Sequence, residues 1–325
     1  MTLTINTNIA SIVAERNLNN ATNSLNRSLE RLSTGYKINH ASDNAAGYSI
    51  ADMWTTQIGS LDIASANAST GADLLQTAEQ TYGLLTDHLQ RIRDLTVQAA
   101  NGTYGSASLK AIQSEVEARL QEISRISANA EFNGIKLMAY TADGDGSGIT
   151  SAGLNLQVGL YADSDSIINL ASDLFKDASV SGLFANMTNF DTIIEAANGG
   201  SAPTDGYNSA AGYNAIACAC AGLKMSGNEM VIGENAKQMI GFVDDAITEI
   251  SKRITKIGAA QNRVSSALSG IDVQSQNIVS SLSTLRDTDV ADESSKYIQS
   301  QILQQASATL LATANQTPSI ALNLI

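Results

Sequence analysis

A heptad pattern between Val243 and Leu285 constrains the fold of this chain more than any other part of its sequence. Alternating steps of four and three residues from Val243 reach thirteen positions, of which eleven are aliphatic and two, Gln261 and Ser275, are polar. This pattern predicts one long helix with a continuous apolar seam, packed at coiled-coil register against other helices. Such a helix would be roughly 64 Å long, which is unusual in a compact enzyme and indicates a fold built from long helices.

The composition agrees with long helices and excludes several classes of protein. Only two of the 325 residues are proline, and neither occurs in the first 202 residues. A net charge of −13 argues against nucleic-acid binding, which requires a basic surface. No apolar run is long enough to span a membrane, and the N-terminus lacks the basic and apolar regions of a secretory signal peptide. The chain is therefore expected to be cytoplasmic or exported through another signal.

Apolar periodicity predicts helices at both ends of the chain and a different structure in the middle. Expected helices cover residues 5–33, 48–98, 108–128, 243–285 and 295–313, and the helical pattern resumes from near Asn228. In the middle, Leu154 to Leu160 alternate with polar residues or glycine, and Ile167 to Leu170 could pair with them as a β-hairpin. A short amphipathic helix is expected around Phe184 to Ile194.

These elements predict a mainly α fold: an elongated antiparallel helical bundle with both termini at one end, a small β-hairpin region and a short outer segment. The terminal helices carry narrow apolar stripes, such as Leu18, Leu25 and Leu32, and bury too little to be stable alone. They are therefore expected to order against copies of the same chain. A contact of this kind that repeats without closing produces a helical filament.

Several stretches of the sequence closely resemble the bacterial flagellins. Near the N-terminus they are INTNIAS (5–11), RNLN (16–19), SLERLSTGYKIN (28–39), SDNAAG (42–47), LQTAE (75–79), LQRIRDLTVQAANGT (89–103) and FNGIKLM (132–138). Near the C-terminus they are GAAQNR (258–263), RDTDVADES (286–294) and QILQQASATLLATANQTP (301–318). Asn44, Trp54 and Thr313 depart from the usual family residues. The resemblance covers about residues 1–138 and 236–325.

The resemblance implies a layered subunit. Residues 1–40 and 290–325 would form an inner, channel-lining helical domain, and residues 41–180 and 230–289 a shell of long helices with the β-hairpin. Residues 181–229 would be a short variable region that faces solvent. The implied function is a non-enzymatic structural subunit of the extracellular flagellar filament, which self-assembles for swimming motility.

The resemblance also implies partners. Export would proceed unfolded through the flagellar type III pathway, with a chaperone on the C-terminal helix, and filament cap and hook–filament junction proteins would contact the assembled chain. Arg91, Leu95 and Glu115 match the family motif that contacts Toll-like receptor 5 of animal hosts. The same residues could instead serve only packing between subunits, or both roles could hold together. Two rival interpretations stay open: a hook–filament junction protein, and a non-flagellar coiled-coil adhesin or signalling protein.

The remaining candidate residues predict no catalytic, cofactor or metal site. Gln261 and Ser275 either fix the register of the long seam or lie where the seam meets solvent. Cys218 and Cys220 form a C-x-C without further soft ligands nearby, which favours two buried or half-buried thiols. His40 and His88 are too few for a metal triad, and neither H-E-x-x-H, nor a phosphate loop, nor a G-x-S-x-G elbow occurs.

Overall fold

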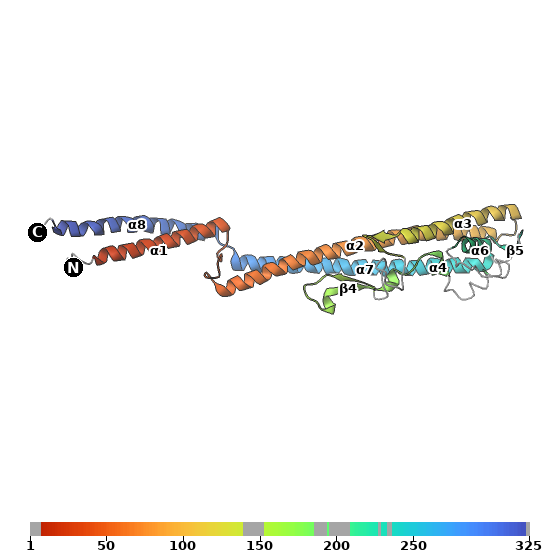
Figure 1. The fold of residues 1–325 in the computed structure, drawn as a ribbon, viewed down its shortest axis with the longest axis horizontal. Coiled ribbons are helices and arrows are strands. Elements are labelled where there is room, and N and C mark those ends of the chain that lie inside the picture. Colours follow the sequence, from red (N-terminus) through yellow and green to blue (C-terminus); the bar gives the residue numbers. More distant parts are fainter. Residues whose placement is uncertain are drawn as a thin grey trace. The chain divides into compact units, whose positions relative to one another are not determined.

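The fold was analysed in a computed structural model that describes residues 8–138, 153–184, 194, 209–226, 229–232 and 236–322. Long helices dominate it, as the periodicity predicts (Figure 1). They are α1 (Ile9–Thr34), α2 (Ala45–Ala99), α3 (Ser106–Asn129), α7 (Ala236–Arg286) and α8 (Val290–Leu322). The short helices α4 (Val180–Phe184) and α6 (Ala210–Cys220) lie in the middle of the chain.

The chain divides into two compact units. The terminal unit comprises Met1–Ser60 and Val273–Ile325, and the central unit comprises Leu61–Asp272. The inner domain expected from the sequence, 1–40 with 290–325, lies inside the terminal unit. Its role as a separate layer concerns an assembled polymer and stays a prediction.

In the terminal unit, α1 and α8 lie side by side and antiparallel (Figure 1). The side-chain amide of Asn8 donates to the Ala314 carbonyl at 2.7 Å, while Arg31 at the other end of α1 pairs with Glu293 at 3.7 Å. These contacts confirm that the first and last helices of the chain lie together.

Both ends of α1 follow from the local sequence. The Asn8 side chain caps its first turn by accepting a hydrogen bond from the Ser11 amide at 3.1 Å. Gly35 ends the helix at φ 77°, a left-handed conformation that glycine adopts without strain, and donates to the Arg31 carbonyl. The helix therefore ends within one residue of the predicted range 5–33.

The central unit is built on α2, α3 and α7, joined by side-chain pairs such as Arg93 with Asp244 and Arg91 with Glu115. None of the thirteen predicted seam positions of α7 is exposed, and Val243, Ile250, Ile257, Val264 and Ile271 are buried. A second buried row, which the heptad pattern does not include, consists of Met239, Ala246, Arg253 and Ala260. The buried stripe of α7 is therefore wider than a two-helix seam requires, because α7 contacts more than one neighbour.

Within the described residues, three antiparallel hairpins accompany the helices, where the sequence indicated one. The predicted hairpin is confirmed: β3 (Leu154–Gln157) pairs with β4 (Ile167–Leu170), with Leu156 opposite Ile168. β1 (Glu131–Phe132) pairs with β2 (Ile135–Lys136) across Asn133 and Gly134, both with positive φ as a tight hairpin turn requires. β5 (Leu223–Ser226) pairs with β6 (Glu229–Ile232).

The last hairpin changes two expectations. The helical pattern does not resume near Asn228, because β5 and β6 occupy this region and α7 begins only at Ala236. In addition, α6 is buried at Ala215–Ala221 and packs on α3, which differs from the solvent-facing position expected for 181–229. The expected helix around 184–194 lies mostly outside the described residues, although Ile194 is buried.

Candidate functional site

The interface between α1 and α8 is formed mainly by small and polar side chains. Its least exposed positions follow a heptad spacing on each helix. They are Ser11, Ala14, Leu18, Ala21, Leu25, Ser28 and Leu32 on α1, and Glu293, Tyr297, Ser300, Gln304, Ser307, Leu311 and Ala314 on α8. Small residues let the helix backbones approach closely, and hydrogen bonds cross the interface, such as Gln304 to Thr22 at 3.1 Å.

Apart from Leu18, Leu25, Leu32 and Leu311, nine large aliphatic side chains of the same two helices are left outside this interface. We call these residues, each 42–68% exposed, the exposed aliphatic set. They are Ile9, Ile12, Val13, Leu29, Val290, Ile298, Ile302, Leu303 and Leu310. Leu18, Leu25 and Leu32, the apolar stripe predicted for this helix, are half-buried in the interface.

Burial of the exposed aliphatic set would release a large hydrophobic free energy for a single pair of helices. Full burial of one such side chain contributes about 1.5–3 kcal/mol relative to full exposure. Nine side chains that are roughly half exposed therefore leave on the order of 10 kcal/mol unused in a single chain. A surface of this kind marks a site of interaction with another macromolecule.

A polar clasp ties the end of α1 to the start of α8. It consists of a β-bridge between Tyr36 and Asp287, with the Lys37 amide donating to the Arg286 carbonyl at 2.7 Å. The Arg286 guanidinium also lies 4.3 Å from the centre of the Tyr36 ring, in cation–π contact. The clasp fixes the pair at one end, so α1 and α8 present the exposed aliphatic set in a defined register.

Arg91, Leu95 and Glu115 are brought together, but they do not form one exposed patch. Arg91 Nε donates to Glu115 Oε1 at 3.0 Å, and Arg119 donates to the same oxygen at 3.1 Å. Burial opposes ionisation of Glu115, but the two guanidinium hydrogen bonds outweigh it and lower the pKa of this carboxyl. Leu95 is only 2% exposed and lies in the core of the central unit.

The two polar positions of the α7 seam are both half-buried. The side-chain amide of Gln261 donates to Glu79 Oε2 on α2 at 2.8 Å. This bond joins α2 and α7 at one defined register, which the sequence could indicate only as a polar break. Ser275 lies in the part of α7 that belongs to the terminal unit.

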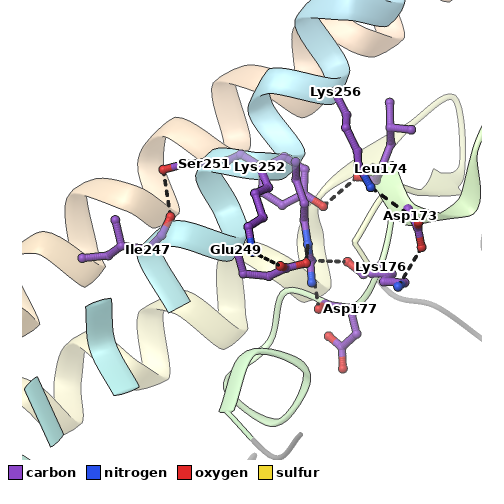
Figure 2. A network of polar contacts seen from close by, with 11 residues as sticks. Asp173, Leu174, Lys176, Asp177, Ile247, Glu249, Ser251, Lys252 and Lys256 are labelled. Carbon is purple, nitrogen blue, oxygen red and sulfur yellow. Dashed lines mark hydrogen bonds and ion pairs between the residues drawn. The ribbon is translucent and has the colours of Figure 1, made fainter. Parts of the chain in front are cut away.

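A further polar network, which sequence reasoning missed, surrounds Arg253 in the central unit. Figure 2 shows Glu249 and Lys256 of α7 facing Asp173, Lys176 and Asp177 of the segment that follows β4. Arg253 itself is 4% exposed and donates to two carbonyls of this segment. Its spacing of seven residues from Ala246 and from Ala260 was the signal in the sequence that could have indicated its burial.

The two thiols lie in α6, where burial raises the pKa of Cys218 to about 11 and that of Cys220 to about 12. Both are free and buried.

Among the described residues, no group of three or more His, Cys, Asp or Glu side chains lies close enough to hold a metal ion. In the same part of the chain, no helix is long and apolar enough to cross a membrane.

Comparison with known proteins decides the family. The family model of the bacterial flagellin N-terminal helical region matches residues 5–143, and that of the C-terminal helical region matches residues 240–325. The chain belongs to the bacterial flagellin family. The two matches contain α1, α2, α3 and α8 and nearly all of α7, and hence the exposed aliphatic set.

Individual flagellins are similar over the whole chain. Polar flagellin F of Vibrio parahaemolyticus is 31% identical over 376 aligned residues, and flagellin D of Vibrio anguillarum is 33% identical over 376, each with 100% of both chains covered. The flagellar filament 33 kDa core protein of Treponema phagedenis is 30% identical over 325 residues, with 99% of both chains covered. The region between the two flagellin models contains β3 to β6, α4 and α6.

Proposed function

We propose that the chain is a structural subunit of the bacterial flagellar filament, a helical polymer that serves swimming motility. The observation that carries this proposal is the exposed aliphatic set on α1 and α8. A soluble monomer gains nothing from leaving these side chains in water, whereas further copies of the same helix pair would cover them. Membership of the flagellin family and the relative named as a flagellar filament core protein support the same function.

A point substitution tests the proposal without disturbing the subunit. Ile302→Ser removes an aliphatic side chain that is 60% exposed, and Gln305→Ser, at an exposed position of the same helix, is the matched control. Monomers seeded with filament fragments should elongate with the control, and much more slowly with Ile302→Ser. Circular dichroism should show the same helix content in both. Equal elongation, or a stable dimer that never polymerises, would contradict the filament proposal and favour a coiled-coil protein of another class.

We infer that assembly also involves partners. Before polymerisation the aliphatic side chains of α8 need cover, which an export chaperone on the C-terminal helix would supply. Export through the flagellar type III pathway, addition of subunits beneath a filament cap, and contact with hook–filament junction proteins belong to the same proposal. If this pathway exports the chain, the intact mass of protein from filaments should include the N-terminal segment from residue 2 onward. A shorter N-terminus, as left by a signal peptidase, would contradict this route.

We further propose that the monomer activates Toll-like receptor 5 of animal hosts through the surface around Arg91 and Glu115. The support is an accessible charged pair, since the Arg91 side chain is 48% and the Glu115 side chain 37% exposed. Leu95 would act beneath them as a packing residue. Folded monomer should activate reporter cells that carry the receptor, and Arg91→Ala should reduce this response. A folded monomer without any response would exclude receptor recognition but would not affect the filament proposal.

A further inference from the structure

The segment that follows the β3–β4 hairpin, residues 172–184, is packed into the central unit with little regular structure. We call this segment the strap. It contains a 3-10 turn (η2, Ser172–Leu174) and α4. Its apolar side chains are buried, and two of them, Phe175 and Phe184, are among the largest fully buried side chains of the described residues. The strap therefore contributes much of the core near the middle of α7.

The carbonyl groups of the strap are bound by side chains of the long helices. Arg253 Nη1 of α7 donates to the Lys176 carbonyl at 3.0 Å and to the Asp177 carbonyl at 3.2 Å. The Tyr82 hydroxyl of α2 donates to the Leu174 carbonyl at 2.9 Å. These three carbonyls lie outside every described strand. The side chains of Arg253 and Tyr82 therefore supply the hydrogen bonds that a neighbouring strand would supply in a sheet.

Arg253 is suited to this role by its burial and its surroundings. Its side chain is 5% exposed, and its guanidinium carbon lies 6.0 Å from the centre of the Tyr82 ring. Its acidic neighbour Glu249 is 43% exposed and 3.5 Å away, so the carbonyl oxygens supply much of the compensation for the buried charge. On the outer side, Lys256 and Lys176 both pair with Asp173 in solvent.

We propose that Arg253 is a latch: a positioning residue whose guanidinium holds the strap closed on α2 and α7. The strap then constitutes a separate opening unit, which detaches when the latch is lost while the long helices stay folded. Proteins open locally in cooperative units, and the free energy of such an opening is lower than that of global unfolding. Only one residue, Ala171, separates β4 from the strap. The latch therefore also holds the end of the β3–β4 hairpin close to the core.

Hydrogen exchange of the full-length monomer tests the latch. Arg253→Met keeps the aliphatic stem and a high helix propensity but leaves the two carbonyls without their donor. The strap amides of Ala178, Val180 and Leu183 donate to the Met138 carbonyl, the Ser124 hydroxyl and the Ser179 carbonyl, and their exchange should accelerate roughly 10- to 100-fold. Amides in the middle of α7 and α8 should keep their rates. Lys252→Gln is the matched control, because Lys252 is exposed and pairs with Glu249 without touching the strap.

A second variant keeps the test decisive if Arg253→Met does not fold. Tyr82→Phe removes only the hydroxyl that donates to the Leu174 carbonyl and should accelerate the same strap amides about tenfold. Unchanged strap exchange in these variants would overturn the latch. Equal acceleration of strap and α7 amides would overturn the separate opening unit, since the strap and the helices would then unfold together.

Discussion

At the scale of single residues, charged and polar side chains fix contacts between the long helices. Gln261 is a polar residue in the aliphatic seam of α7, and its side-chain amide donates to Glu79 of α2. A hydrogen bond to a charged group contributes about 1.5–3 kcal/mol to stability. The clasp at Tyr36 and Arg286 acts similarly between α1 and α8. Contacts of this kind add modest stability but select one register out of several that an aliphatic seam permits.

Gln261→Leu should therefore change the shape of the filament while leaving the stability of the subunit nearly unchanged. Leucine regains apolar contact in the seam but leaves the half-buried Glu79 without its donor, so the free energy of unfolding should change by less than about 2 kcal/mol. The register of α2 against α7 becomes less defined, and the helical parameters of reassembled filaments should change. Electron microscopy of filaments measures this. Unchanged filament shape and switching would contradict a register role for Gln261.

Glu115 gives a pH dependence with a definite sign. Its pKa in the folded chain lies below the ordinary value of 4.5, so the stabilisation is present above that value and is lost as the pH falls through the folded pKa. Because the side chain is 37% exposed, the contribution should not exceed about 1 kcal/mol. Urea unfolding should show wild type more stable than Glu115→Gln at neutral pH, with the difference disappearing once the pH has fallen below the folded pKa of Glu115. A difference that persists in acid would indicate packing instead.

At the scale of elements, α2 is shaped to accept the hairpin. A Cβ at Gly71 would collide with Leu156 of β3, whereas a Cβ at Gly83 of the same helix would meet nothing within 4 Å. The side-chain amide of Asn67, one turn before Gly71, also donates to the Gln157 carbonyl at 3.3 Å. A glycine inside a helix costs about 1 kcal/mol relative to alanine, and at Gly71 the close approach of the hairpin accounts for it.

Substitution of these two glycines by alanine should consequently affect the stability of the monomer differently. Gly83→Ala should raise the free energy of unfolding by about 0.5–1 kcal/mol through helix propensity alone. Gly71→Ala gains the same propensity but displaces Leu156, and overpacking of this kind costs about 1–3 kcal/mol, so it should be neutral or destabilising. Thermal unfolding of both monomers measures the contrast. Equal stabilisation by both would show that the hairpin does not depend on the space at Gly71.

At the scale of the whole molecule, the two compact units are suited to different tasks. The central unit buries large side chains such as Tyr82, Phe175 and Leu120. The α1–α8 pair of the terminal unit buries small ones and leaves the exposed aliphatic set in solvent. A single chain therefore contains one part with a core of its own and one part whose burial is completed by other copies.

Deletion of residues 1–30 or 296–325 should separate these tasks. Either deletion removes most of the α1–α8 pair, so seeded elongation should be abolished because the aliphatic contacts between copies are gone. The central unit should keep a cooperative thermal transition, since Leu61–Asp272 contains its own core. Electron microscopy and circular dichroism measure the two outcomes. Elongation by a deleted chain, or loss of the central transition, would contradict this division.

The sequence by itself determined the long helices and the β3–β4 hairpin, because apolar periodicity and strand alternation are local signals. Only the tertiary structure decided which side chains of α1 and α8 are buried, and that Leu95 lies in the core while Arg91 pairs outside it. The structure also added the second buried row of α7 and the place of Arg253 in it. The reason is that a heptad pattern defines a stripe on a helix, whereas the choice and number of neighbouring helices decide how much of that stripe is covered.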